Sequence, residues 1–186
     1  MSLDLDAHLR EAPVSRRPIY EGRLIRVFDD IVRLPDGREA HREVVEHPGA
    51  VTIVAIDASD RVVLVRQWRH PAGRALWELP AGTRDRAGEP LEATAARELA
   101  EETGVTAGEW RVLGHAPLAP GYSTEEMHFF AASLLEIGAA AADDDELLDV
   151  GWFNPAEFAA LVQSGAVDVK TMAGLALAGW TVAQRG

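Results

Sequence analysis

Short runs of apolar residues separated by polar turns fill the first part of this chain, and they predict strands rather than helices. Val and Ile, which favour extended backbone, are frequent in these runs, and Asp36-Gly37 is a hairpin turn signal between two of them. A polar turn at 57–60 separates another two. Four strands are therefore expected in a region that turns to strand pattern from Ile19, at 24–34, 39–46, 51–56 and 62–67.

The apolar spacing changes to a helical period after Pro90, a residue that suits the first turn of a helix. Gly104 suits the end of that helix, because glycine readily adopts the left-handed conformation found there. Further strands are expected at 110–115, 127–132 and 149–153, and further helices at 155–163 and 170–183. Strands, a helix, more strands and then two helices indicate an α/β fold, with a mixed sheet covered by helices on both faces.

Length and composition indicate an ordinary globular protein. The 186 residues are 47% hydrophobic, which suits one domain over 17–186 after a flexible segment at 1–16. No apolar stretch approaches the roughly 20 residues that a membrane-spanning helix needs, and the first residues lack the order of a secretory signal. The chain has no cysteine, which excludes disulfides, thiolate metal sites and a cysteine nucleophile. A cytoplasmic location fits these observations.

The charge of the chain bears on its partners. A formal net charge of −12 disfavours nucleic acid and anionic membranes as partners, because phosphate groups need clustered Lys and Arg. The acids gather in two groups, one within 78–102 and one formed by Asp143, Asp144, Asp145, Glu146 and Asp149. Concentrated carboxylates suit a hard divalent cation, which prefers oxygen ligands.

Three glutamates lie on one face of the helix expected after Pro90. Glu98, Glu101 and Glu102 are spaced i, i+3 and i+4, so their carboxylates are expected to converge. Like charges near a helix C-terminus repel one another and oppose the helix dipole, and a bound cation would offset that cost. The plainer alternative is a solvated acidic face. Arg97 is placed either to orient Glu101 or to reach back to Glu89.

The segment 82–105 resembles the Nudix box, whose pattern is Gly, five residues, Glu, seven residues, and then Arg-Glu-apolar-x-Glu-Glu-x-Gly-apolar. Every fixed residue type is present over these 24 residues. The one departure is a gap of six residues, instead of five, between Gly82 and Glu89. The extra residue falls in the loop before the helix, where insertions are tolerated, and leaves the Glu89–Arg97 spacing unchanged.

The resemblance implies a Nudix α/β/α sandwich with a mixed β-sheet, preceded by antiparallel N-terminal strands. It also implies a Mg²⁺ site, with Mn²⁺ as a substitute. By position, Glu98 and Glu102 would be metal ligands, Glu101 a ligand or a base, and the carbonyl of Ala81 a further ligand. Gly82 would allow a tight loop at the substrate. Glu89 and Arg97 would attach that loop to the helix, and Gly104 would end the helix.

Features outside the box are similar to the ADP-ribose pyrophosphatase branch of this family. Pro120 follows Gly104 by sixteen residues, as in that branch, although a plain Pro-Gly turn is the alternative. The pattern around Arg69 and Glu78 also resembles the branch. This resemblance implies that Arg69 contacts the substrate phosphates and that Glu78 contacts the sugar–phosphate end, with a surface arginine as the alternative for Arg69.

The second acidic group would supply the general base of this branch, with Glu146 as the best positional match and Asp145 as the second. A solvated loop is the alternative. The resemblance further implies a homodimer whose N-terminal strands, within 17–46 and chiefly from Tyr20 to Glu46, pack on the partner. Lys170 is the chain's sole lysine, and the sequence assigns it no role.

The function expected is Mg²⁺-dependent hydrolysis of ADP-ribose to AMP and ribose 5-phosphate. Three other substrates are alternatives within the same enzyme class. They are another nucleotide-sugar (a nucleoside-diphosphate sugar other than ADP-ribose), a dinucleotide and coenzyme A. A different class is a non-catalytic Nudix domain that binds a nucleotide as a sensor. The complete set of acids in the box argues against the sensor, because ligand binding alone does not need a full metal site.

Overall fold

The computed structural model describes residues 6–138 and 147–180, and the chain forms two compact units. The first unit comprises Met1–Pro48 and Pro117–Glu126, and the second comprises Gly49–Ala116 and Met127–Gly186. Within the first unit, the amide of Val45 donates to the carbonyl of Tyr122 at 2.7 Å, and the amide of Thr124 donates to the carbonyl of Val45 at 3.0 Å. These bonds tie the segment 117–126 to the N-terminal strands. The single domain expected over 17–186 stays a prediction.

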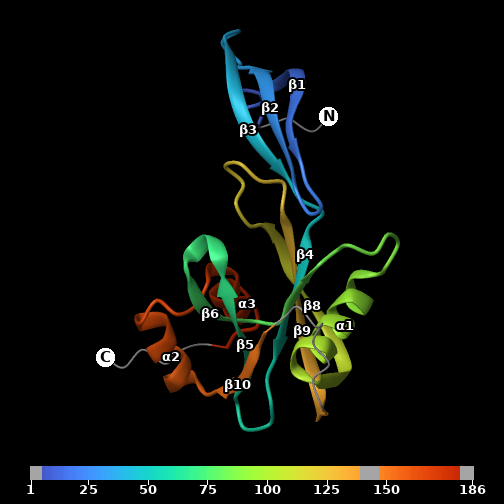
Figure 1. Ribbon diagram of the computed structural model, residues 1–186, viewed down its shortest axis with the longest axis vertical. Coiled ribbons are helices and arrows are strands. Elements are labelled where there is room, and N and C mark those ends of the chain that lie inside the picture. Colours follow the sequence, from blue (N-terminus) through green and yellow to red (C-terminus); the bar gives the residue numbers. More distant parts are fainter. Residues whose placement is uncertain (1–5, 139–146, 181–186) are drawn as a thin grey trace. The chain divides into compact units, whose positions relative to one another are not determined.

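The first unit is built on a three-stranded antiparallel sheet in the order β1-β2-β3 (Figure 1). Its strands are β1 (Ala12–Glu21), β2 (Arg26–Arg33) and β3 (Glu39–Glu46). The strands expected at 24–34 and 39–46 are confirmed. However, β1 begins at Ala12, so part of the segment expected to be flexible is a strand. Opposite charges across the β1–β2 pair support this strand, and the bond from Arg16 Nε to Asp30 Oδ1 measures 2.8 Å.

The second unit contains two sheets. The first has the order β7-β4-β9-β8, and β4 and β9 run parallel, so this sheet is mixed. Its strands are β4 (Ala50–Ala55), β7 (Ala81–Thr83), β8 (Val105–Pro117) and β9 (Glu126–Ile137). The other sheet is antiparallel in the order β10-β5-β6, formed by β5 (Val62–Arg69), β6 (Arg74–Glu78) and β10 (Asp149–Phe153). A single 3₁₀ turn, η1 (His70–Ala72), joins β5 to β6.

Three helices cover the core of the second unit, namely α1 (Leu91–Thr103), α2 (Pro155–Gln163) and α3 (Val169–Leu177) (Figure 1). Neighbouring residues of β4 bury opposite faces. Ile53 packs in a cluster with Leu99 of α1, and Val54 packs in a second cluster with residues of α2 and α3. The expected arrangement of helices on both faces is therefore confirmed. Among the described residues, no helix combines the length and apolar character needed to cross a bilayer.

The ends of the last two helices follow from their capping residues. The Asn154 side chain accepts from the amides of Ala156 and Glu157, so α2 begins where the sequence predicts. It ends at Gln163, also as expected. By contrast, α3 ends at Leu177, and the expectation that it continues through 178–180 is wrong. Gly179 has φ +75°, which turns the chain and allows Trp180 to pack against the core and donate to Asp60 at 2.8 Å. Residues 181–183 lie outside the described part of the chain.

Candidate active site

The helix α1 is bounded by backbone features that the sequence signals. Pro90 has φ −62° and ψ 144°, so it precedes the helix rather than forming its first turn, and Leu91 is the first helical residue. At the other end, Gly104 has φ +72° and its amide donates to the carbonyl of Ala100 at 2.9 Å. These limits place Glu98, Glu101 and Glu102 in the last two turns of α1.

Glu102 faces the start of β7. Its side chain is buried, and its Oε2 accepts a hydrogen bond of 3.1 Å from the backbone amide of Ala81. Ala81 is also the residue whose carbonyl is expected to bind metal. The helix and the strand are thus joined at two residues that are both expected to supply metal ligands, Glu102 through its carboxylate and Ala81 through its carbonyl.

Gly82 lies against the side chain of Glu98. A Cβ atom added to Gly82 would fall 1.9 Å from Cδ of Glu98, which is far inside van der Waals contact. Any larger residue at position 82 would therefore push the carboxylate of Glu98 away. This close approach explains the glycine by space rather than by backbone conformation.

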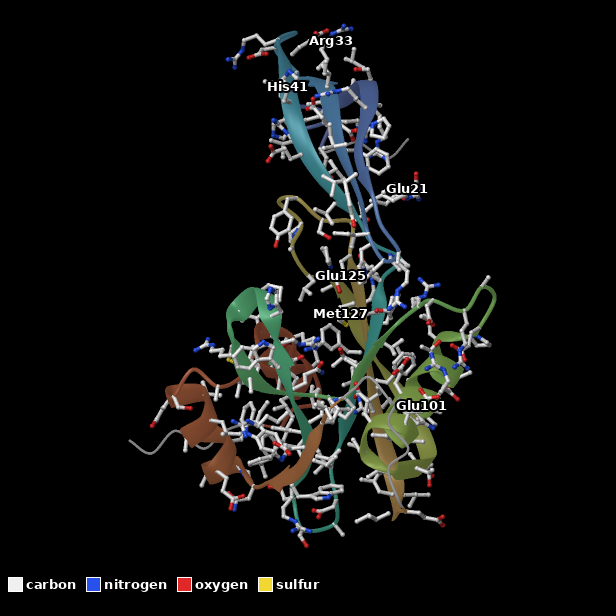
Figure 2. All side chains as sticks on the ribbon, viewed as in Figure 1. Glu21, Arg33, His41, Glu101, Glu125 and Met127 are labelled. Carbon is white, nitrogen blue, oxygen red and sulfur yellow. The ribbon has the colours of Figure 1, made fainter. Side chains whose placement is uncertain are left out.

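Arg97 connects the acids of α1 to one another. Its Nη1 lies 2.7 Å from Oε1 of Glu98 and 2.8 Å from Oε2 of Glu101, which is labelled in Figure 2. Its Nη2 lies 3.3 Å from Oε2 of Glu89. Burial by itself lowers the pKa of Arg97, but the hydrogen bonds to Glu89 and Glu101 and the charge of Glu98 outweigh it and raise that pKa. Both roles considered for Arg97 are therefore found together.

The loop between β7 and α1 adds contacts that the sequence did not indicate. Thr94 donates to Oε2 of Glu89 at 2.9 Å, which holds the end of the loop against the first turn of the helix. Within the loop, Asp85 lies 3.8 Å from Arg97, and Arg86 lies 3.9 Å from Glu89 and 4.0 Å from Glu101. The one signal available in the sequence was the longer loop itself, and a position in a loop does not reveal what its side chains contact.

The expected convergence of Glu98, Glu101 and Glu102 on one patch is found in part. Glu98 and Glu101 meet at the same nitrogen of Arg97, whereas Glu102 turns to Ala81. The cationic side chain between Glu98 and Glu101 offsets their repulsion. In the described part of the chain, no group of three or more His, Cys, Asp or Glu side chains is arranged to hold a metal ion.

The remaining donors still fit Mg²⁺, which keeps several water ligands and often uses one or two carboxylates together with substrate phosphates. Glu98 and Glu102 carry hard oxygen donors on adjacent turns of α1, and the backbone amide of Ala81 is hydrogen-bonded to Glu102. The space above Gly82, which any Cβ would fill, is taken by the Glu98 side chain. Arg97 can release Glu98 because it retains Glu89 and Glu101 as partners.

Arg69 and Glu78 form an ion pair at the ends of β5 and β6. Arg69 Nε lies 2.7 Å from Oε1 of Glu78, and Nη2 lies 2.5 Å from Oε2. Glu78 is only 2% exposed, and it also accepts from Lys170. The carboxylate therefore holds Arg69 in this structure, and the expected contact of Glu78 with the sugar–phosphate end of a substrate stays a prediction.

Three expected site residues are not among the contacts described above. Pro120 is exposed in the part of the first unit that joins β8 to β9, where the amide of Tyr122 donates to the carbonyl of Ala119 at 3.1 Å. Its role in binding stays a prediction. Glu146 and Asp145 lie outside the described residues, so their expected role as a base also stays a prediction.

The Arg97 contacts predict how stability depends on pH. The hydrogen bond from Arg97 lowers the pKa of Glu89, so its stabilisation is complete above the ordinary glutamate pKa of about 4.3 and is lost as pH falls through the lowered value. Arg97→Gln is expected to reduce the free energy of unfolding by about 1–3 kcal/mol at pH 7.

Urea unfolding at pH 7 and at about pH 3 measures this difference. The deficit of Arg97→Gln should shrink at the lower pH, where Glu89 begins to take up a proton. Arg111→Gln, at an exposed position on β8, is the matched control and should stay within about 0.5 kcal/mol of the parent protein. A deficit that is equal at both pH values would contradict the role given to these charges.

Models of two protein families match the chain. The NUDIX domain matches residues 46–173, and the nucleoside diphosphate sugar hydrolase N-terminal domain matches residues 13–45. The first match covers more than two thirds of the chain and includes the whole of β7, the loop and α1.

Proteins of known name are similar over most of their length. An ADP-ribose pyrophosphatase of Mycobacterium tuberculosis is 44% identical over 156 residues, which cover 83% of this chain and 75% of that protein. An ADP-ribose pyrophosphatase of Bacillus subtilis is 36% identical over 166 residues, which cover 88% of this chain and 89% of that protein. A solved structure described as an ADP compounds hydrolase shares the fold with a TM-score of 0.79 at 23% identity, and covers 91% of this chain and 92% of that one. The chain therefore belongs to the Nudix family and is a Nudix hydrolase.

Proposed function

We propose that this protein hydrolyses the pyrophosphate bond of ADP-ribose to give AMP and ribose 5-phosphate, with Mg²⁺ bound by Glu98 and Glu102. The observation that carries the proposal is the joining of α1 to β7, where Glu102 accepts from Ala81 and Glu98 lies against Gly82. The names of the relatives from M. tuberculosis and B. subtilis support the choice of ADP-ribose.

The chemistry assigns a task to each residue. A diphosphate repels an attacking nucleophile, and Mg²⁺, when bound, neutralises phosphate oxygens and lowers the pKa of a coordinated water. Glu98, Glu102 and the carbonyl of Ala81 would hold the ion, and Glu101 is a further ligand or a base. Mn²⁺ has similar ligand preferences and would substitute. Arg97 holds Glu98 and Glu101 by ion pairs. Arg69 would contact the substrate phosphates.

Mg²⁺-dependent release of AMP from ADP-ribose tests this function. Glu102→Gln is expected to lower turnover by about 10²-fold or more, because removal of one metal ligand weakens the charge stabilisation of the transition state. A glutamine still accepts the hydrogen bond from Ala81, so the variant should keep its fold. Glu92→Gln removes an acid from the exposed first turn of the same helix and should leave turnover unchanged.

Two results would favour the alternatives. If ADP-ribose bound tightly but stayed intact with Mg²⁺ present, the protein would be a nucleotide-binding sensor. If AMP appeared faster from another nucleoside-diphosphate sugar, or if a dinucleotide or coenzyme A were cut faster, the same site would serve that substrate.

The general base is proposed to be Glu146, in the acidic segment outside the described residues. A base must lie within hydrogen-bonding reach of the attacking water, and its loss costs about 10²-fold or more in turnover. Glu146→Gln should therefore lower kcat by at least this factor with little change in KM. Asp145→Asn is the matched comparison and should retain turnover. The opposite order of effects would move the role to Asp145.

The protein is also proposed to form a homodimer through its N-terminal strands, within 17–46. All of β1 is exposed, and its side chains include Ile19 at 54% and Tyr20 at 58% exposure, which a partner surface would cover. Sedimentation equilibrium should give twice the mass of one chain. Ile19→Asp should shift the protein towards monomer, whereas Val112→Asp, at an exposed position on β8, should not. A monomeric parent protein would refute the dimer. A cytoplasmic location stays a prediction.

A further inference from the structure

Lys170 is buried at the beginning of α3, where no contact with substrate is expected. It is the sole lysine of the chain and is 7% exposed. Its Nζ contacts the carboxylates of Glu78, at the end of β6, and of Asp168, which caps α3. A buried ammonium group is costly unless it is paired, so this position calls for a reason beyond packing.

Glu78 joins Lys170 to Arg69. One carboxylate oxygen accepts from Arg69 Nε, and the other accepts from both Arg69 Nη2 and Lys170. Two parallel bonds fix the plane of a guanidinium group, which a single bond does not. Burial raises the pKa of Glu78, but the hydrogen bond from Arg69 and the charge of Lys170 outweigh burial and lower that pKa, so the carboxylate is held as an anion.

Arg69 reaches solvent from this buried pair, and its side chain is 41% exposed. The hydrogen bond and the charge of Glu78 raise the pKa of Arg69 against the effect of burial, and the charges of Asp168 and then of Glu102 add smaller effects in the same direction. Arg69 is therefore anchored on one side by Glu78 and lies within electrostatic range of an expected metal ligand on the other.

The presence of Lys170 changes what Arg69 can offer to a ligand. If Glu78 faced Arg69 alone, the single negative charge would neutralise the guanidinium and draw it inwards. Because Lys170 shares the same carboxylate, Arg69 keeps both its fixed orientation and attraction for another anion. Asp168 also contacts Lys170, and its charge acts on Arg69 as well.

We propose that Lys170 is a positioning residue that acts through Glu78 to hold Arg69 ready for an oxygen of the substrate diphosphate. The proposal rests on the proposed function, because that function assigns Arg69 to the phosphates. Lys170 itself touches no substrate. Residues that orient a binding group without contacting the ligand themselves typically change affinity or activity by about 10–100-fold when they are removed.

A double-mutant cycle between Lys170 and Arg69 separates this role from a structural one. Lys170→Met is expected to lower kcat/KM for ADP-ribose by about 10-fold, mainly by raising KM, when Arg69 is intact. In an Arg69→Met background the same change should alter kcat/KM by less than about 2-fold, because the residue through which Lys170 acts is gone. Equal losses in both backgrounds, or no loss when Arg69 is intact, would overturn the proposal.

Two further variants control for folding. Lys170→Arg keeps a cation beside Glu78 and should restore kcat/KM to within about 3-fold of the parent, even if Lys170→Met is too unstable to study. Asp168→Asn keeps the helix cap, since asparagine caps as well as aspartate, but removes a charge that acts on both Lys170 and Arg69. It should not lower kcat/KM, because Lys170 and Arg69 both keep Glu78 as a partner. A loss as large as that of Lys170→Met would attribute both losses to a disturbed start of α3 and overturn the proposal. Failure of Lys170→Arg in a folded protein would count against a role based on charge.

A binding measurement distinguishes failure of this proposal from failure of the proposed substrate. The four proteins of the cycle are titrated calorimetrically with inorganic pyrophosphate and Mg²⁺, which does not require ADP-ribose to be the substrate. The same coupling between Lys170 and Arg69 should appear in the dissociation constants. If the parent releases no AMP from ADP-ribose but the coupling is present, the substrate is wrong and the positioning role stands. Independent effects on pyrophosphate affinity would refute the positioning role, whatever the substrate.

Discussion

The neutralisation of clustered carboxylates by a single guanidinium group is the interaction on which the site depends. Arg97 contacts Glu89, Glu98 and Glu101, so one cation serves the loop, the middle of α1 and its last turn. Without such a group, acids at this spacing would repel one another and oppose the helix dipole. The arrangement lets the chain place several acids on one helix, including those proposed to bind a metal, with their charge partly neutralised.

The strand β7 and the residues before it connect two parts of the second unit. On one side, the amide of Leu79 donates to the Thr171 hydroxyl of α3 at 2.8 Å, and Lys170 of the same helix contacts Glu78. On the other side, Ala81 and Gly82 contact the acids of α1. A stretch of five residues, 78–82, therefore links α3 to α1, so that contacts at α3 help to position the residues beside the acids of α1.

Sequence patterns reached some parts of this structure and not others. The helix α2 could be placed at both ends because its signals are local, with Asn154 as cap and Pro155 after it. The box could be recognised because its spacing is fixed by one helix. The short strands β6 and β7 could not be predicted, since three to five residues next to Gly and Pro carry too little periodicity. The pairing of Lys170 with Glu78 joins residues 92 positions apart, and no pattern along the chain reports such a contact.

The hydrogen bond between Ala81 and Glu102 has a consequence for observing the site directly. The amide proton of Ala81 is donated to a side-chain carboxylate, so its protection from exchange with solvent depends on where that carboxylate points. If Glu102 binds an ion as proposed, this hydrogen bond is weakened or lost. The nuclear magnetic resonance signal of the Ala81 amide would thus report whether the Glu102 carboxylate accepts from β7 or binds a cation.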